Sequence, residues 1–333
     1  MKKSILITGA TSGMGLENTI LFAQKGYQVF ATYRSDKDRA KLQKIKNVHP
    51  VKMEVTNTDD IQDAFQEISA TVGRDGLFAI INNAGIMYTS PFEYADEKQA
   101  RHVMDVNLMA PFKIAQTFIP LLKKHNANNT IKARVINIAS WAGYIGQPFI
   151  PFYNASKAGL IGLTESMYYD LGLLDIHVVL ASPGVTRTPM LGKATVDGDD
   201  NLKALPKEGQ AFYKPYLDHR KAMGESSGNS KLLPTADVLA KKLYKIVESK
   251  KPKHKYNLGM DAAFMDNVMT KIIPMSWRFA LNKSMYKLNM KNPAKALSQK
   301  EFSQPIDKKT FTVFHKPKRH KHDKNNKHLT NSD

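Results

Sequence analysis

The sequence predicts an α/β protein built on a doubly wound parallel sheet of about seven strands, with helices on both faces. Apolar, β-branched runs alternate along the chain with helix-like stretches, and a glycine-rich turn follows the first run. The strands are expected near residues 3–8, 27–33, 49–55, 77–82, 132–139, 176–182 and 254–259. Helices should connect them, including a long one over 96–124 and another over about 151–173.

The first of these strands ends in a turn that is typical of a dinucleotide site. The apolar run breaks into TGATSGMG at residues 8–15, and a helix-like segment follows. In this context Gly9 permits the tight turn, Gly13 permits close approach of the pyrophosphate, and Gly15 lets the helix pack on the strand. The N-terminus of the helix then offers N–H groups and a positive dipole to the phosphates.

Tyr153 and Lys157, in the segment YNASK, are the strongest indication of catalysis. Four residues make about one helical turn, so the phenol and the ammonium should project from the same face. A free phenol titrates near pH ~10, and a cation ~4 Å away at an effective dielectric of ~20 is worth about 4 kcal/mol. We therefore expect Lys157 to lower the pKa of Tyr153 towards neutrality, where proton transfer is efficient.

The composition suits a globular protein with a large core, since 42% of the 333 residues are hydrophobic and 24% are charged. The chain has no cysteine, which excludes disulfides and thiolate-metal sites and fits a cytoplasmic location. Residues 241–333 hold 22 Lys/Arg against 7 Asp/Glu, so +15 of the +19 net charge lies there. The C-terminal part is therefore the basic part of the chain.

We expect a single domain over residues 1–260. Within it, residues 189–233 lose the alternating pattern, and a stretch this long inside a compact domain predicts a lid over the substrate. Residues 261–298 should form a helical extension, and 299–333 a basic disordered tail. The tail has no recognised nucleic-acid module and its histidines no fixed metal geometry, whereas peripheral membrane contact stays open for the basic region.

With these residues in place, the chain resembles the short-chain dehydrogenase/reductase family over about residues 3–260. From residue 189 onward it is most similar to the hydroxysteroid and retinol dehydrogenase branches. The resemblance implies a Rossmann-type fold and hydride transfer between a nicotinamide and a carbonyl or secondary alcohol. It rests on five motifs in order, namely TGATSGMG, the NNAG of residues 82–85, Asn107, the set Ser140, Tyr153 and Lys157, and Pro183-Gly184 followed by Thr186 and Thr188.

The resemblance also implies roles for single residues. Tyr153 would be the proton donor or acceptor, and Lys157 would lower its pKa and bind the nicotinamide ribose. Ser140 would hold the substrate oxygen, and Asn107 would bind a water that links Lys157 to solvent. Glu54 stands where the family usually has Asp. The cofactor would contact Gly9, Thr11, Ser12, Gly13, Met14, Gly15, Arg34, Glu54, Val55, Asn83, Ala84, Gly85, Tyr153, Lys157, Pro183, Gly184, Val185, Thr186 and Thr188.

The choice between the two nicotinamide cofactors should be read at the end of the second strand. Tyr33 stands where an NAD-selecting acid is usual, and Arg34 follows it. An arginine can pair with a 2′-phosphate through charge-assisted bonds, and Ser12 could add a hydroxyl. NADP(H) is therefore the expected cofactor, with NAD as the alternative.

A lipophilic alcohol or ketone, of the steroid, retinoid or fatty type, is the expected substrate. Apolar and aromatic side chains could line its cleft, namely Phe149, Phe152, Met190, Leu191, Phe212, Tyr213 and Tyr216. The resemblance further implies a homodimer or homotetramer built on the long helices around Asn107 and Tyr153. Two alternatives stay open: a reductase of a small polar carbonyl, and a non-catalytic NAD(P)-sensing scaffold. No metal site is expected.

Overall fold

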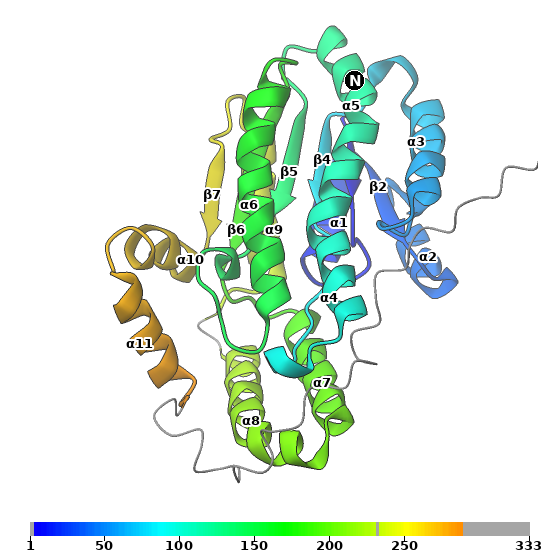
Figure 1. The fold of residues 1–333 in the computed structure, drawn as a ribbon. Coiled ribbons are helices and arrows are strands. Elements are labelled where there is room, and N and C mark those ends of the chain that lie inside the picture. Colours follow the sequence, from blue (N-terminus) through cyan, green and yellow to red (C-terminus); the bar gives the residue numbers. More distant parts are fainter. Residues whose placement is uncertain (1–2, 231–232, 289–333) are drawn as a thin grey trace, which may run out of the picture. The chain divides into compact units, whose positions relative to one another are not determined.

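The computed structural model describes residues 3–230 and 233–288, in which a seven-stranded parallel sheet has the order β3-β2-β1-β4-β5-β6-β7 (Figure 1). Each strand overlaps one of the predicted ranges. The order reverses between β1 and β4, and in such sheets ligands bind outside the carboxyl ends of the strands at this point. The strands are β1 (Ser4–Ile7), β2 (Gln28–Tyr33), β3 (Val48–Lys52), β4 (Ala79–Asn82), β5 (Arg134–Ile138), β6 (His177–Pro183) and β7 (Lys255–Leu258).

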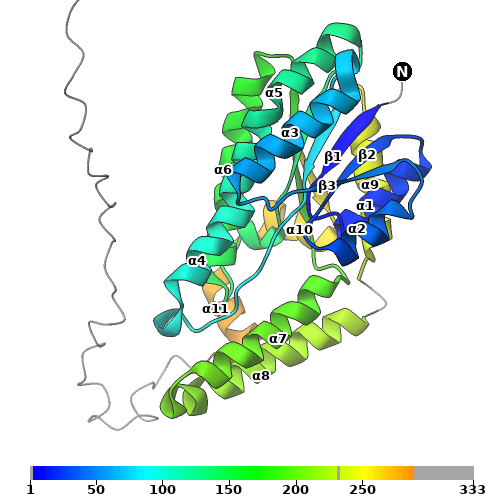
Figure 2. The same cartoon turned by 90° about the vertical axis from the view of Figure 1, so that its right-hand side faces the viewer.

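Helices cover both faces of the sheet (Figures 1 and 2). Alternation along β1 separates two cores, because Leu6 packs on one side whereas Ile5 and Ile7 pack on the other. Leu6 faces α3 (Thr58–Val72), α5 (Ala110–Asn128) and α6 (Pro151–Gly172). Ile5 and Ile7 face α1 (Gly13–Gln24), α2 (Asp36–Gln43) and α9 (Ala236–Glu248). The short 3-10 turns are Gly73–Asp75, Phe92–Tyr94 and Trp141–Gly143.

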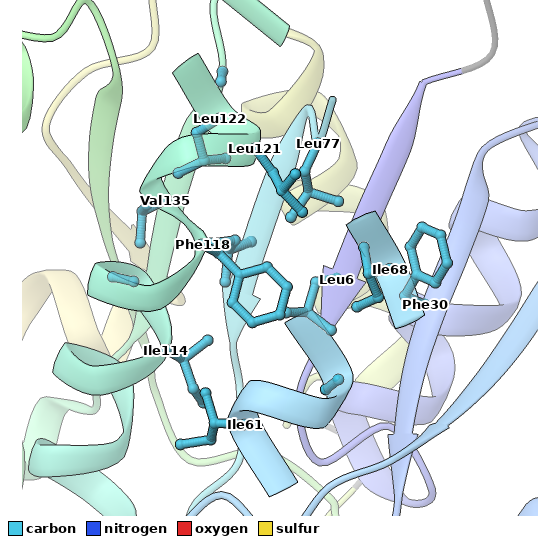
Figure 3. Close-up of a cluster of buried hydrophobic side chains, with 14 of the residues drawn as sticks. Leu6, Phe30, Ile61, Ile68, Leu77, Ile114, Phe118, Leu121, Leu122 and Val135 are labelled. Atoms are coloured by element: carbon cyan, nitrogen blue, oxygen red, sulfur yellow. The ribbon is translucent and has the colours of Figure 1, made fainter. Parts of the chain in front are cut away.

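The core under α3 and α5 shows why these strands are apolar along their whole length (Figure 3). Phe118 of α5 reaches Leu6 of β1, and Ile68 of α3 packs beside Phe30 of β2. All four side chains are fully buried. A parallel sheet covered on both faces has no solvated side, so the strand residues that point to either face are apolar.

The helix predicted over 96–124 is interrupted. It consists of α4 (Glu97–Met104), a π-helical turn at Asp105–Met109, and α5, which continues to Asn128. A π turn inserts an extra residue and changes the direction of the side chains that follow, and such turns are frequent at functional sites. Here it places Asn107 in the interior of the protein, where its side chain is 0% exposed.

Within residues 189–233, where the sequence pattern showed no regular element, α7 (Pro189–Ala204) and α8 (Lys207–Asn229) form a helical hairpin. Two of the prolines in this stretch lie where helices tolerate them, whereas Pro215 lies inside α8. Pro189 is at the first turn of α7, and Pro206 directly precedes α8. The hairpin buries its own small cluster, made by Leu202, Leu205 and Leu217.

The predicted C-terminal extension is described as far as residue 288, and residues 289–333, with the predicted tail, lie outside the described part. It contains α10 (Met260–Phe264), a π turn at Met265–Met269 and α11 (Met275–Met285). Among the described helices none has the length and apolar character that a bilayer span requires.

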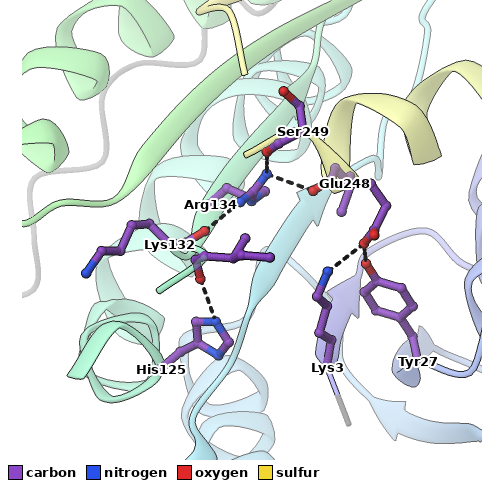
Figure 4. A network of polar contacts seen from close by, with 9 residues as sticks. Lys3, Tyr27, His125, Lys132, Arg134, Glu248 and Ser249 are labelled. Atoms are coloured by element: carbon purple, nitrogen blue, oxygen red, sulfur yellow. Dashed lines mark hydrogen bonds and ion pairs between the residues drawn. The ribbon is translucent and has the colours of Figure 1, made fainter. Parts of the chain in front are cut away.

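A buried arginine holds the amino-terminal edge of the sheet together (Figure 4). Arg134, the first residue of β5, donates hydrogen bonds of 2.7 Å to the backbone oxygens of Lys132, Val247 and Ser249. Its guanidinium also lies 4.6 Å from the centre of the Phe78 ring. Since two of these oxygens belong to the C-terminal end of α9, Arg134 fixes that helix to the sheet, at the edge opposite the carboxyl ends of the strands.

Candidate active site

A cavity of about 600 Å³ lies at the carboxyl edge of the sheet. Its walls come from the glycine-rich loop, the segments after β4, β5 and β6, and the α7–α8 hairpin. Ser140 and all of the predicted cofactor-binding residues line it. Asn107 does not, although it contacts Ile86, which does. The tertiary structure thus brings together motifs that are far apart in the sequence.

The glycine-rich loop has the crowded backbone that a bound pyrophosphate requires. Gly9 has φ +62°, and a Cβ atom there would lie 2.9 Å from the Cα atom of Ala84. A Cβ atom on Gly15 would lie 2.0 Å from the backbone oxygen of Gly9. Ser12 is the N-cap of α1, but its hydroxyl makes no capping bond and is free for a ligand. The loop and the helix N-terminus therefore fit the phosphates of a dinucleotide.

Asn83 ties the NNAG segment to the glycine-rich loop. Its side-chain amide donates to the backbone oxygens of Thr8, at 2.9 Å, and Gly9, at 3.2 Å. The Thr8 hydroxyl in turn accepts from the backbone N–H groups of Asn83 and Ala84, both at 3.0 Å. The side chain of Asn83 thus holds two cofactor-binding segments at a fixed separation.

At the other end of the cavity, two predicted cofactor contacts form one ion pair. The Arg34 guanidinium, which is 67% exposed, lies 3.3 Å from the Glu54 carboxylate. The other oxygen of Glu54 accepts from the backbone N–H and the hydroxyl of Thr56. A second cation, not predicted from the sequence, lies nearby, because Lys41 of α2 donates to the backbone oxygen of Thr11 at 2.9 Å. A basic residue in the helix after β2 could have indicated it.

Tyr153 lies in the first turn of α6, and its buried hydroxyl hydrogen-bonds with Ser140. Ser140 follows β5, and its hydroxyl also accepts from the backbone N–H of Ala142 at 3.2 Å, so it caps the short turn that begins there. Burial raises the pKa of Tyr153, and the bond from Ser140 opposes this more weakly. The expectation that Lys157 sets a lowered pKa of Tyr153 is therefore wrong for this structure.

Lys157 directs its hydrogen bond to the backbone. Its ammonium donates to the backbone oxygen of Ile138 at 2.9 Å and lies 5.9 Å from the centre of the Tyr153 ring. Burial lowers the pKa of Lys157 to about 8, so the side chain is still mostly protonated at pH 7 and loses its charge above pH 8. The two side chains do lie on one face of α6 and both line the cavity, as predicted.

Asn107 has a structural position that the sequence did not indicate. Its side-chain oxygen accepts from the backbone N–H of Ile86 at 2.9 Å. Its amide donates to the backbone oxygen of Ile86 at 2.9 Å and to the Ser156 hydroxyl at 3.0 Å. These bonds attach the segment after NNAG to α6, next to Tyr153 and Lys157.

Asp261 is a cavity residue that sequence reasoning missed. Its carboxylate accepts from the backbone N–H of Val185 at 2.6 Å, in the segment predicted to bracket the nicotinamide. It lies so close to Gly184 that a Cβ atom there would be 1.9 Å from a carboxylate oxygen. The available signal was its place shortly after β7, at the carboxyl edge of the sheet.

The predicted lining of the substrate cleft is largely wrong. Met190 lines the cavity, but Phe152 stacks on Phe92, and the side chain of Leu191 lies outside the described part. The remaining aromatic residues pack on one another, namely Phe149, which precedes α6, and Phe212, Tyr213 and Tyr216 of α8. The apolar walls come instead from Met87, Trp141, Ile150, Leu217, Met223, Met265 and Met285.

Comparison with known proteins supports this site. The family described as short chain dehydrogenase matches residues 3–198. The chain is 29% identical over 267 residues to a 3-amino-tetrahydro-pyrrolizinone reductase of Xenorhabdus hominickii, covering 80% of this chain and 90% of that protein. It is 27% identical over 290 residues to retinol dehydrogenase 5 of Mus musculus, covering 81% and 88%.

A solved structure is also similar to this chain. Carbonyl reductase from chicken fatty liver, in its NADPH-bound form, superposes with a TM-score of 0.53 at 31% identity, covering 57% of this chain and 78% of that one. The family match spans more than half of the chain and includes the glycine-rich loop, Ser140, Tyr153 and Lys157. The chain therefore belongs to the short-chain dehydrogenase family and is an NAD(P)-dependent oxidoreductase.

Proposed function

We propose that the protein interconverts a lipophilic carbonyl compound and its secondary alcohol, prefers NADP(H), and uses Tyr153 as the acid/base. The observation that carries this proposal is the position of the Tyr153 hydroxyl. It is buried, bonded to Ser140, and lines the same cavity as the glycine-rich loop. A sensing scaffold would have no need of an acid/base at that place.

The residues present suit this chemistry. A bound nicotinamide supplies or accepts the hydride at the substrate carbon. For reduction, Tyr153 gives its proton to the carbonyl oxygen while the Ser140 hydroxyl donates a hydrogen bond to the same oxygen. The raised pKa of Tyr153 keeps this proton in place at neutral pH. For oxidation Tyr153 must first lose its proton, and its phenolate then takes the alcohol proton, whereas Lys157 would hold the ribose hydroxyls.

The preference for NADP(H) rests on the cations near the adenosine end. Arg34 lines the cavity, Lys41 donates to the backbone oxygen of Thr11 in the glycine-rich loop, and the Ser12 hydroxyl makes no capping bond. A 2′-phosphate would draw Arg34 away from Glu54, replacing one anion by another of higher charge. The NADPH named for the chicken carbonyl reductase is consistent with this preference.

The apolar walls favour a lipophilic substrate, and the retinol dehydrogenase resemblance agrees with them. We assign the α7–α8 hairpin as the lid, because Leu217 and Met223 of α8 form part of the cavity wall. An opening movement of this hairpin would admit the substrate.

Two exposed apolar surfaces support the expected partners. Met109, at the start of α5, together with Phe112, Tyr168 and Tyr169 of α5 and α6, would form the interface of a homodimer or homotetramer. A second set lies on the C-terminal extension near Lys271 and Lys283 and would suit peripheral contact with an anionic membrane, namely Met260, Ile272, Trp277 and Phe279.

The test is a screen for NADPH oxidation against carbonyl compounds of several classes. Tyr153→Phe keeps the ring and removes the proton, so turnover should fall by at least about 100-fold. Tyr244→Phe is the matched control, since Tyr244 lies on α9 and does not line the cavity, and its activity should equal that of the wild type. Wild-type turnover by Tyr153→Phe would refute the catalytic assignment, and turnover of small polar carbonyls alone would refute the lipophilic class.

A further inference from the structure

Helix α8 carries an arginine to the cavity wall that the chemistry above does not use. Arg220 donates to the backbone oxygen of Pro148 at 3.4 Å and to the Met87 sulfur at 3.9 Å. It also hydrogen-bonds with the hydroxyl of Tyr286. All of these acceptors are neutral and two of the contacts are long. No carboxylate of the described residues lies within ion-pair distance of this guanidinium.

The unpaired charge distinguishes Arg220 from its neighbours. Lys221, the next residue, pairs with Asp199 at 2.5 Å, and Arg34 pairs with Glu54, although all four side chains line the cavity. Burial lowers the pKa of Arg220, and its contact with Tyr286 opposes this shift. Cations removed from water are normally paired with anions, whereas this guanidinium uses three of its five N–H donors on neutral acceptors and two remain for a ligand.

Arg220 is connected to the cluster that contains Tyr153 through Met87. Met87, which accepts one of its bonds, packs against a cluster formed by Ala142, Ile150 and Tyr153. On the other side, the Tyr286 hydroxyl donates to the side-chain oxygen of Gln147 at 3.0 Å and so is held in place. A group bound to the guanidinium would thus leave the rest of a substrate lying along the Met87 and Ile150 wall towards Tyr153.

We propose that Arg220 binds a carboxylate of the substrate, so that the substrates are lipophilic oxo acids and their hydroxy acid counterparts. A planar guanidinium matches the two oxygens of a carboxylate, and the apolar walls would hold the hydrocarbon part between the carboxylate and the reacting carbon. This inference rests on the proposed function, since it names the substrate class of the same site.

The test compares straight-chain oxo acids with their methyl esters, which have the same chain and ketone but no charge. For the wild type with NADPH, the acids should have the lower KM. In Arg220→Met the KM for the acids should rise about 10- to 100-fold, with kcat changed much less and the esters unaffected. Arg220→Lys should restore part of the loss. Lys214→Met, which removes an exposed cation of the same helix, should leave both series unchanged.

A binding measurement separates this inference from the proposed function. Calorimetric titration of the same acids and esters into NADPH-loaded Tyr153→Phe, with and without Arg220→Met, reads the carboxylate site without turnover. Acid binding that depends on Arg220 but no turnover by the wild type would reject the proposed reaction and keep the site. Equal affinities for acid and ester, no binding of either, or an equal loss of both in Arg220→Met would overturn the inference, since the last result means that Arg220 only supports the fold.

Discussion

The Lys157 ammonium and the Tyr153 ring lie one helical turn apart on α6, with 5.9 Å between the nitrogen and the ring centre. The ammonium donates a hydrogen bond to the backbone oxygen of Ile138 rather than to the phenol. Both groups are buried, and burial favours the neutral form of each, so it lowers the pKa of Lys157 and raises the pKa of Tyr153. The pair is thus a protonated phenol beside an ammonium whose pKa is lowered by burial.

The buried charge of Lys157 should reduce the stability of the cofactor-free protein. A pKa lowered from 10.5 to about 8 corresponds to roughly 3 kcal/mol of unfolding free energy. This cost is complete below pH 8, where both states are protonated. It decreases as pH rises from 8 towards 10.5, because the folded state loses the proton first. Lys157→Met should therefore be the more stable protein at pH 7, and its advantage should shrink above pH 8 in urea unfolding. A difference that does not vary with pH would contradict the buried charge.

Arg34 and Glu54 should act in opposite senses on cofactor choice. Arg34→Asp removes the cation and adds a second acid, so the KM for NADP(H) should rise about 10- to 100-fold relative to that for NAD(H). Glu54→Gln frees Arg34, and the KM for NADP(H) should fall. Arg101→Met removes an exposed arginine of α4 and serves as the control. Steady-state kinetics with both cofactors measures this preference. An unchanged preference for NADP(H) in Arg34→Asp would contradict the assignment of Arg34 to the 2′-phosphate.

Asp261 should position the segment that follows β6. Asp261→Ala removes the acceptor for the Val185 N–H, which leaves that backbone group without its charged partner. The dissociation constant for NADPH should rise about tenfold, as expected for one hydrogen bond to a charged group. Asp261→Asn keeps an acceptor oxygen, so its dissociation constant for NADPH should lie between those of the wild type and Asp261→Ala. Fluorescence titration of NADPH measures this, and an Ala variant that binds as the wild type does would remove Asp261 from the site.

Arg134 should contribute to stability and not to catalysis. Arg134→Met leaves three backbone oxygens without their donor, so the free energy of unfolding should fall by roughly 3 kcal/mol or more. The kinetic constants of the folded enzyme should not change, because the residue lies at the opposite edge of the sheet. Lys132→Met removes a partly exposed ion pair with Asp175 and should cost less than about 1 kcal/mol. Chemical unfolding and kinetics on the same samples provide the check.

Much of the fold and the site could be predicted because local patterns specify them. Seven apolar runs became seven strands, and the glycine-rich turn fell between β1 and α1. The spacing of Tyr153 and Lys157 placed both on the cavity face of one helix. These features depend on residues within a few positions of one another, and strand and helix periodicity describes such relationships directly.

The tertiary structure decided what depends on burial and on contacts between distant residues. Only packing shows that residues 189–233 pair as two helices, that a π turn turns Asn107 inward, and that Asp261 reaches Val185. The protonation of Tyr153 could not be predicted from its spacing to Lys157, since it depends on desolvation by the surrounding fold, which raises the pKa of the phenol. Arg220 likewise is one basic residue among many in the sequence, and only the structure shows that α8 places it at the cavity wall with no carboxylate of the described residues within ion-pair distance.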